Sequence, residues 1–190
     1  MMTYPKIWLL RHGQTEWNAQ ERIQGQLESP LTALGIEQAH QQAALLGDIL
    51  ALNPDCFCSP LGRAQQTAKI ALGGNHYETD ARLAEVYAGV WQGLTRDEVR
   101  AQWPELFHAN PHHLDLFCAA TESEGFQVFQ SRIADFLGDL TGPSVLVAHG
   151  LLGQVVRGLT RGLKRPKMGA LTNQQGCVYL LENGTEQVLE

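Results

Sequence analysis

Two short apolar runs, each followed at once by His-Gly, constrain the fold of this chain most strongly. Ile7-Trp8-Leu9-Leu10 precedes Arg11-His12-Gly13, and Ser144-Val145-Leu146-Val147-Ala148 precedes His149-Gly150. Neither run has the polar gaps of an amphipathic helix or the alternation of a half-exposed strand. Continuous apolar runs of this length are typical of strands that are buried on both faces, as in a parallel sheet covered by helices.

The segments between and around these runs alternate between helical and extended patterns. Thr32 is expected to cap a helix that reaches about Leu50. Ser123 is expected to cap a helix whose apolar stripe begins at Phe126 and Phe129. The remaining expected elements are a strand at Asp55–Cys58, a helix from residue 60, an extended segment at 77–83, short helical pieces at 95–117 broken at two prolines, a helix at 150–163 and a hairpin at 176–189 turning at Asn183-Gly184. This order predicts an α/β fold: a single three-layer domain, residues 1–190, with a mostly parallel central sheet flanked by helices.

Composition narrows the class of protein. The 190 residues are 44% hydrophobic and 18% charged, which is typical of a globular domain. The net charge of −6 argues against a duplex nucleic-acid binder. Four cysteines without C-x-x-C spacing favour neither a disulfide scaffold nor a zinc ribbon, and no apolar stretch is long enough for a membrane span. We therefore expect an acidic, soluble, cytoplasmic protein with no membrane or nucleic-acid partner. The sequence makes no prediction of oligomeric state.

The two His-Gly pairs predict where a ligand would bind. In an open α/β sheet, ligands bind outside the carboxyl ends of the strands, which is where His12 and His149 would lie. Arg11 is adjacent to His12, and Arg63 follows the expected strand at Asp55–Cys58. Two guanidinium groups and two imidazoles at one edge would suit a small polyanion such as a phosphate. On this pattern alone, two unrelated polar residues at strand ends remain an alternative.

Five blocks of sequence, in order along nearly the whole chain, resemble the histidine phosphatase superfamily, whose fold is also called phosphoglycerate-mutase-like. The blocks are Leu10-Arg11-His12-Gly13-Gln14-Thr15-Glu16-Trp17-Asn18, Pro30-Leu31-Thr32-Ala33-Leu34-Gly35, Ser59-Pro60-Leu61-Gly62-Arg63-Ala64, Leu83-Ala84-Glu85 with Gly89-Val90-Trp91-Gln92-Gly93, and Val147-Ala148-His149-Gly150. A lone Arg-His-Gly would be weak evidence for this family, whereas five blocks in the family's order are a specific resemblance.

The resemblance implies phosphoryl transfer through a phosphohistidine, without a metal ion or cofactor. His12 would be the nucleophile, and Arg11, Arg63 and His149 would stabilise the charge on the transferred group. Glu85 falls where the family keeps its general acid, so the site is expected to hold Glu85 beside bound phosphate. The expected phosphate or substrate contacts are Asn18, Thr15, Gln24, Gly25, Gly150 and Tyr87.

The spacing between Glu85 and His149 bears on which reaction the chain performs. In the glycolytic mutases of the family this region carries a longer insertion that closes over the substrate, so the shorter span favours a phosphomonoester hydrolase of the small phosphatase branch. A helical segment at about 86–122 would cap the site, with Val86, Tyr87 and residues 103–117 as its roof. A mutase-type phosphotransferase and a non-catalytic module that binds a phosphorylated ligand are the alternatives. The resemblance leaves the substrate open among α-ribazole phosphate, phosphoserine, sugar phosphates and a broad range of esters.

Two further clusters are given structural interpretations. Arg157, Arg161, Lys164, Arg165 and Lys167 form a basic run that is expected to be a solvated face, with steering of an anionic substrate as the alternative. His108, His112 and His113 lie in the proline-broken segment without a cysteine at ligand spacing, so no metal site is expected there.

Overall fold

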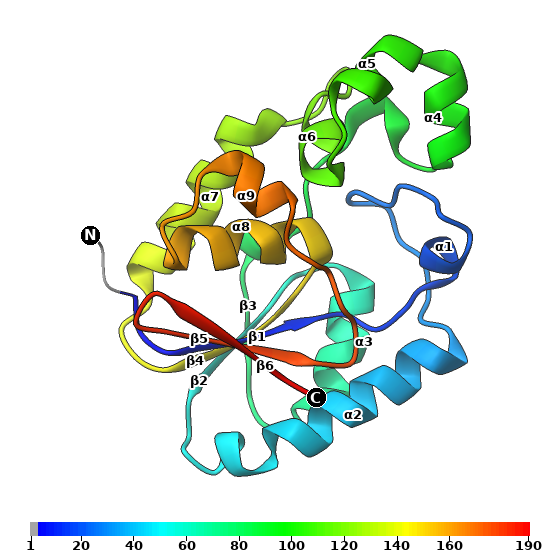
Figure 1. Cartoon of the computed structure of the whole chain (residues 1–190). Helices are drawn as coiled ribbons and strands as arrows, with labels where there is room; N and C mark the ends of the chain where they lie inside the picture. Colours follow the sequence, from blue (N-terminus) through cyan, green and yellow to red (C-terminus); the bar gives the residue numbers. More distant parts are fainter. Residues whose placement is uncertain (1–3) are drawn as a thin grey trace.

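The strands of the computed structural model, which describes residues 4–190, form one sheet in the order β3-β2-β4-β1-β5-β6 (Figure 1). Strands β1, β2, β3 and β4 pair in parallel, whereas β5 and β6 run antiparallel to their neighbours. The bounds are β1 Ile7–Arg11, β2 Asp55–Cys58, β3 Glu78–Thr79, β4 Ser144–Ala148, β5 Val178–Glu182 and β6 Thr185–Leu189. The expected mostly parallel sheet is therefore confirmed.

Helices cover both faces of this sheet, which gives the three layers that the sequence predicts (Figure 1). The longer helices are α2 Ala33–Leu50, α3 Gly62–Ala71, α7 Gly125–Asp139 and α8 Gly150–Thr160. The shorter ones are α1 Glu16–Ala19, α4 Arg96–Gln102, α5 Pro104–Ala109, α6 His113–Cys118 and α9 Arg165–Gly169, together with the 3₁₀ turns η1 Ala81–Leu83 and η2 Gly89–Trp91.

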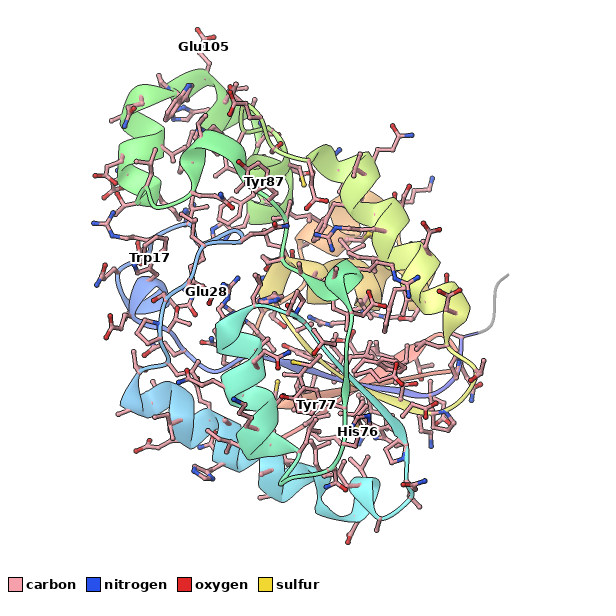
Figure 2. The ribbon with its side chains drawn as sticks, turned by 180° about the vertical axis from the view of Figure 1, so that it is seen from behind. Trp17, Glu28, His76, Tyr77, Tyr87 and Glu105 are labelled. Atoms are coloured by element: carbon pink, nitrogen blue, oxygen red, sulfur yellow. The ribbon has the colours of Figure 1, made fainter. Side chains whose placement is uncertain are left out.

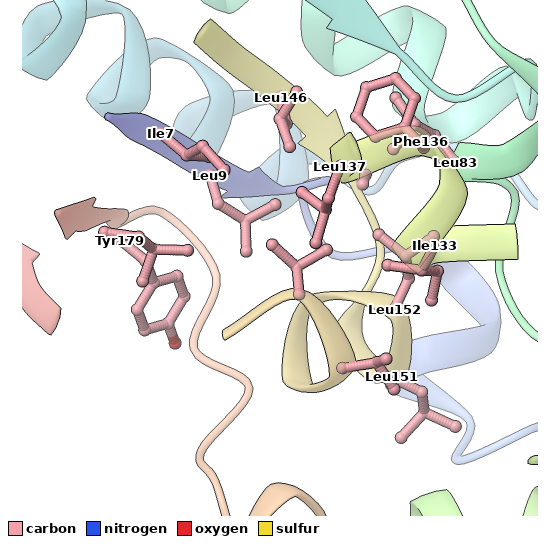
Figure 3. Close-up of a cluster of buried hydrophobic side chains, with 14 of the residues drawn as sticks. Ile7, Leu9, Leu83, Ile133, Phe136, Leu137, Leu146, Leu151, Leu152 and Tyr179 are labelled. Carbon is pink, nitrogen blue, oxygen red and sulfur yellow. The ribbon is translucent and has the colours of Figure 1, made fainter. Parts of the chain in front are cut away.

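The two apolar runs are buried on both faces because their alternate residues join different cores. Ile7 and Leu9 of β1 point into a core formed with α7 and α8, where Ile133 and Leu152 also lie (Figure 3). Trp8 lies in a second core with residues of α2 and α3. A strand covered on both faces needs apolar residues at successive positions, which is the pattern that identified β1 and β4.

Helices α4, α5 and α6 form a lobe beyond the edge of this sandwich, with a small core of its own (Figure 1). Trp91 and Val99 are fully buried there, and Ile23 reaches into the same core from the loop after α1. Figure 2 shows Glu105 at the tip of the lobe, far from His76 and Tyr77. Pro104 is the first residue of α5, consistent with the break expected at that proline.

Several element boundaries differ from the expected ones. Helix α7 begins at Gly125 with Glu124 as its cap, so the expected cap at Ser123 is wrong; the Ser123 hydroxyl donates to the carbonyl of Cys118 at 2.9 Å. Helix α8 ends at Thr160 rather than near residue 163, and α3 begins at Gly62. The expected hairpin is confirmed: Asn183 and Gly184, with φ of 51° and 74°, form the turn between β5 and β6.

The basic run at 157–167 is not a solvated face in its first half, so that expectation is wrong. Arg157 is buried and forms a bidentate ion pair with Glu186 of β6, at 2.6 and 2.9 Å. Its guanidinium also lies 3.9 Å from the centre of the Tyr179 ring. Arg161 pairs with the same Glu186, and Arg165 pairs with Asp115. These arginines therefore hold parts of the fold together.

Among residues 4–190, no helix is both long and apolar enough to cross a membrane.

Candidate active site

The parallel pairing of β1 and β4 brings the two His-Gly pairs together. Arg11 pairs in register with Ala148, and the His12 amide donates to the Ala148 carbonyl at 3.0 Å. The rings of His12 and His149 consequently lie with their centres 5.2 Å apart and their planes inclined by 60°. The parallel strands therefore bring the two histidines together at one edge of the sheet, as expected.

His12 is held in one orientation by hydrogen bonds to both of its ring nitrogens. Nδ1 lies 2.7 Å from the carbonyl oxygen of Gly13, which can only accept, so Nδ1 carries the proton. Nε2 is then unprotonated, and it accepts a hydrogen bond from Nε of Arg63 at 3.2 Å. Burial, followed by the charges of Arg63 and Arg11, holds the pKa of His12 well below its ordinary value of 6.5. The imidazole is therefore neutral at physiological pH, with a lone pair on Nε2.

Arg63, at the start of α3, is fully buried although it is charged. Besides its bond to His12, it donates from Nη1 to the carbonyl of Leu27 at 2.9 Å and from Nη2 to the carbonyl of Gly25 at 2.7 Å. The loop that follows α1 thus fixes the orientation of the guanidinium. Each Nη atom still has one hydrogen without a partner in these bonds, because a guanidinium carries five N–H donors.

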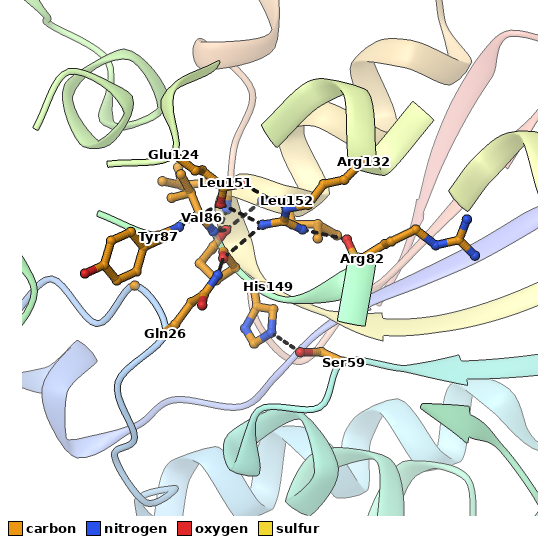
Figure 4. Close-up of polar contacts among 12 residues, drawn as sticks. Gln26, Ser59, Arg82, Val86, Tyr87, Glu124, Arg132, His149, Leu151 and Leu152 are labelled. Carbon is orange, nitrogen blue, oxygen red and sulfur yellow. Dashed lines mark hydrogen bonds and ion pairs between the residues drawn. The ribbon is translucent and has the colours of Figure 1, made fainter. Parts of the chain in front are cut away.

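His149 is equally buried and makes one side-chain hydrogen bond, between Nε2 and Oγ of Ser59 at 2.7 Å (Figure 4). Ser59 Oγ also accepts from the amide of Leu61, so its hydroxyl proton is available for Nε2. That arrangement puts the ring proton on Nδ1, which is buried and has no partner among residues 4–190. Burial and the charge of Arg63 hold the pKa of His149 well below its ordinary value. A buried donor without a partner is costly, so this N–H is suited to a ligand oxygen.

Glu85 lies against the N-terminus of α8, where backbone N–H groups without a partner in the helix point at it. Its Oε1 accepts from the amides of Val86 and Leu152, and its Oε2 accepts from the amide of Leu151, all at 3.0 Å. Oε2 therefore has the smaller number of bonds and retains a free lone pair. The side chain is buried but lines the same cavity as His12.

An ion pair outside the cavity holds the backbone of Glu85 in place. Arg132 of α7 donates to the carbonyl of Arg82 at 2.6 Å and to the carbonyl of Glu85 at 3.1 Å (Figure 4). The same guanidinium binds both carboxylate oxygens of Glu124, at 2.8 and 2.9 Å, and Glu124 also accepts from the amide of Tyr87. The segment on either side of Glu85 is thereby tied to α7 at three backbone groups.

The loop after β1 carries the other expected contacts. Thr15 is fully buried, caps α1 in a capping box with Asn18, and accepts from Gln24 Nε2 at 2.6 Å. The Asn18 amide oxygen accepts from Gln175 Nε2 at 3.3 Å. The tight path of this loop depends on Gly13, because a Cβ at that position would lie 2.1 Å from the carbonyl oxygen of Gly35.

A cavity of about 390 Å³ joins most of these groups. Of the expected site residues, the ones that line it are Arg11, His12, Asn18, Gln24, Gly25, Arg63, Glu85 and Gly150. Thr15 supports Gln24 from behind, and His149 borders a smaller neighbouring cavity with Arg11 and Gly150. Within the described chain, Tyr87 is not part of the cavity wall, since its side chain is partly exposed and its amide is bound by Glu124. Val86 lies in the main core and Trp103 packs in the lobe, so neither forms the expected roof.

Sequence reasoning missed several residues of the cavity wall. They are Gln14, Glu21, Arg22, Ile23, Arg96, Leu151, Asn173 and Gln175. Arg11 donates to the carbonyl of Asn173, and Gln175 donates to the carbonyl of His12 at 3.0 Å. This loop between α9 and β5 carries no signal in the sequence. His113 and Phe117 belong to the segment expected to form the roof, and they are the part of it that reaches the cavity.

The part of the chain that the structure describes contains no group of three or more His, Cys, Asp or Glu side chains arranged to hold a metal ion. The positive charge at the cavity comes instead from side chains, chiefly Arg11 and Arg63. Glu85 opposes the lowering of both arginines' pKa values by burial.

Comparisons with known proteins bear on the family of this chain. Residues 7–188 match the model of the histidine phosphatase superfamily, branch 1. Among curated proteins, one named probable phosphoglycerate mutase GpmB, from Yersinia pestis (strain Pestoides F), is 43% identical over 103 residues, which cover 52% of this chain and 47% of the relative. The chain thus spans about half the length of the curated relatives it matches.

Solved structures match over nearly their whole length. The α-ribazole phosphatase from Shigella flexneri has a TM-score of 0.82 with 28% identity, covering 97% of this chain and 95% of that one. A mycobacterial glucosyl-3-phosphoglycerate phosphatase, solved in complex with VO3, has a TM-score of 0.78 with 28% identity, covering 98% and 97%. Since the family model spans almost every residue that the sheet and the cavity use, the chain belongs to the histidine phosphatase superfamily.

Proposed function

We propose that this protein hydrolyses a small phosphomonoester through a phosphohistidine intermediate on His12, without a metal ion. The observation that carries the proposal is the hydrogen bonding of His12. Its Nδ1 proton is bound by the Gly13 carbonyl, which leaves the lone pair of Nε2 at the cavity beside Arg63. Neutral imidazole is a competent nucleophile, and the lowered pKa of His12 supports its neutral form.

In the first step, Nε2 of His12 gives up the hydrogen bond from Nε of Arg63 and attacks phosphorus with the freed lone pair, and the bond from phosphorus to the ester oxygen breaks. The transferred group spreads negative charge over its remaining oxygens, so catalysis depends on fixed positive charge and positioned donors. Arg11, the free Nη hydrogens of Arg63 and the unpartnered Nδ1–H of His149 supply those donors. Asn18 and Gln24 lie on the same cavity wall and would add neutral hydrogen bonds.

The leaving oxygen needs a proton, which we assign to Glu85. Oε2 retains a free lone pair that can carry it. After the alcohol departs, Glu85 accepts a proton from water while the water oxygen attacks phosphorus and the N–P bond breaks. This step releases phosphate and returns His12 to its starting state. The helices at 86–122 would serve as the cap that limits access, since His113 and Phe117 of α6 line the cavity.

Hydrolysis of p-nitrophenyl phosphate in the presence of EDTA, with inhibition by vanadate, tests the proposal. His12→Ala is expected to abolish both turnover and the trapping of labelled phosphate on the protein. Labelling that persists in this variant would assign the nucleophile elsewhere, and loss of activity in EDTA would contradict a metal-free reaction. Absence of turnover in the native protein would favour the non-catalytic binding module.

Glu85→Gln separates a general acid from a structural carboxylate. The amide cannot protonate the leaving oxygen, so hydrolysis of alkyl phosphates is expected to fall about a hundredfold more than hydrolysis of p-nitrophenyl phosphate, whose leaving group needs little help. The comparison uses kcat for both esters with one enzyme preparation. Equal losses on the two substrates would contradict the assignment.

A phosphoglycerate-mutase-type phosphotransferase is the second candidate, because the curated relatives are named as mutases. In that reaction a second substrate hydroxyl, rather than water, would take the phosphoryl group from His12. Interconversion of phosphoglycerates that requires a bisphosphate primer, with little release of phosphate, would favour this candidate.

All four cysteines are free, which supports our further proposal that the protein acts in the reducing cytoplasm.

A further inference from the structure

The orientation of Arg11, the cation next to His12, depends on a loop without regular secondary structure. Within residues 4–190, the one hydrogen bond of the Arg11 side chain runs from Nη1 to the carbonyl of Asn173, and its Nε is buried without a partner. Asn173 lies between α9 and β5, where residues 171–175 form neither helix nor strand. Such a segment has no ladder of backbone hydrogen bonds to fix it, so other groups must hold this carbonyl in place.

Four successive residues of this loop each have a backbone group bound by a side chain from the body of the protein. The bound groups and their partners are the carbonyl of Leu171 with Gln154, the carbonyl of Thr172 with Arg157, the carbonyl of Asn173 with Arg11, and the amide of Gln174 with the hydroxyl of Tyr179. Gln154 and Arg157 are three residues apart on α8, so they lie on the same face of that helix. The position of the loop is therefore set largely by contacts with α8.

Arg157 differs from the other side chains that hold the loop because it is charged and only 3% exposed. Its Nε and Nη2 bind both carboxylate oxygens of Glu186 on β6, at 2.9 and 2.6 Å, which leaves Nη1 for the Thr172 carbonyl at 2.5 Å. The planar guanidinium thus joins β6 to the loop in one fixed geometry. A buried ion pair costs desolvation that its attraction only partly offsets, so stability alone is a weak reason for this arrangement.

Arg161, at the end of α8, provides the contrast. It pairs with the same carboxylate of Glu186 at 2.9 Å and its side chain is 27% exposed. Within residues 4–190, its side chain makes no hydrogen bond to the loop at 171–175. Arg157 and Arg161 therefore share an ion-pair partner and differ in their contact with the loop. Because Glu186 keeps Arg161 when Arg157 is replaced, that substitution does not leave the carboxylate unpaired.

We propose that Arg157 is a positioning residue for Arg11. By fixing the carbonyl of Thr172, it holds the adjacent carbonyl of Asn173 where that group aims the Arg11 guanidinium into the cavity. Arg157 is not among the described residues that line the active-site cavity, so it acts only through the loop. The consequence for catalysis rests on the proposed function, since it assumes that Arg11 binds the transferred phosphoryl group. Donors that stabilise developing charge are effective only when they are held in place beforehand.

The variant Arg157→Met removes the bonds of the guanidinium while keeping an unbranched side chain in the core. We expect its affinity for vanadate and its kcat for p-nitrophenyl phosphate each to fall about tenfold, the size of one charge-assisted hydrogen bond. The control Arg161→Met also breaks an ion pair with Glu186, but it should change both values by less than about twofold because a partly exposed pair contributes little. Both variants are assayed under conditions in which urea unfolding shows them to be folded. Equal losses in the two variants would overturn the proposal.

A double-mutant cycle with Arg11→Met tests whether Arg157 acts through Arg11. In the Arg11→Met background, Arg157→Met is expected to lower the affinity for vanadate by less than about twofold, because the group that Arg157 positions is already absent. A further loss of about tenfold in that background would assign Arg157 an independent effect and would overturn the proposal. If Arg157→Met does not fold, Arg157→Lys replaces it in the cycle. Lysine retains an ion pair with Glu186 but lacks the planar fork that also binds the Thr172 carbonyl, so the same outcomes apply.

Nuclear magnetic resonance of protein containing isotopically labelled arginine tests the positioning without reference to activity. The Nε–H of Arg11 is buried, and its signal is assigned by its absence from Arg11→Lys. This signal is expected to shift in Arg157→Met and to stay unchanged in Arg161→Met. An unchanged Arg11 signal in Arg157→Met would overturn the positioning role. A shifted signal, in a native protein that fails to hydrolyse p-nitrophenyl phosphate, would support the positioning role and contradict only the proposed function.

Discussion

The two buried histidines make the stability of this fold depend on pH across the range in which an unperturbed imidazole titrates. In the unfolded chain each imidazole binds a proton with a pKa of about 6.5. In the folded protein, burial and the nearby arginines hold the pKa values of His12 and His149 well below that value. Between the two pKa values the unfolded state binds more protons, so lowering the pH favours unfolding.

The size of the effect follows from the linkage relation. Moving from pH 7.5 to pH 5.5 costs each such histidine about 1.4 kcal/mol in the free energy of unfolding, and therefore about 2.7 kcal/mol for the pair. His113, whose pKa is also lowered, adds to the loss in the same direction. Carboxylates with lowered pKa values, such as Asp80 and Glu186, lose their contribution only as the pH falls through and below about 4. These carboxylates therefore contribute little to the change in the free energy of unfolding between the two pH values.

Urea unfolding at a series of pH values, in buffers without phosphate, measures this loss. Phosphate must be absent because an anion bound to the folded state would stabilise it and mask the effect. His149→Gln is expected to remove about half of the pH dependence, whereas the matched variant His40→Gln, on the exposed face of α2, should leave it unchanged. A loss of less than about 1 kcal/mol over the window would mean that the folded state protonates both histidines easily, and would refute the neutral nucleophile.

Two further substitutions test how the site is supported. Arg132→Met removes a half-buried ion pair and two bonds to backbone carbonyls, so we expect a loss of about 2 to 3 kcal/mol in urea unfolding. Because Glu85 is then less well held, kcat for alkyl phosphates should fall more than kcat for p-nitrophenyl phosphate; equal losses would limit Arg132 to a structural role. Gly13→Ala forces a Cβ within 2.1 Å of the Gly35 carbonyl oxygen and should cost about 3 kcal/mol, whereas Gly47→Ala, with open space around it, should not destabilise α2. Similar unfolding midpoints for the two alanine variants would contradict this explanation.

Features that depend on neighbouring residues could be predicted from the sequence. The apolar runs of β1 and β4 identify buried strands, because both faces of each strand meet a core. The Asn183-Gly184 turn follows from the ease with which these two residues adopt positive φ. Since the carboxyl ends of parallel strands share an edge, the meeting of His12 and His149 could also be anticipated. The expected cap at Ser123 was wrong, since α7 begins at Gly125 and its cap position falls on Glu124.

Features that depend on distant partners could not be predicted. Arg157 belongs to a run of basic residues typical of a solvated face, yet Glu186 and the Tyr179 ring cover it. Arg96 has no distinguishing pattern around it in the sequence, and its neighbour Arg100 has a similar local setting. Only the folded chain shows that Arg100 pairs with the carboxylate of Asp97, whereas Arg96 lines the cavity.

The sequence by itself therefore determined most of the secondary structure, apart from several element boundaries, together with the strand ends at which polar groups gather and the reactive side chains that those ends present. The tertiary structure decided which of the charged side chains are paired, which backbone carbonyls orient Arg63 and His12, and which residues of the lobe reach the cavity. The physical reason is the distance along the chain over which each kind of interaction acts. Strand and turn preferences act over a few residues, whereas the pairing and burial of a charge depend on groups brought within a few ångströms from anywhere along the chain.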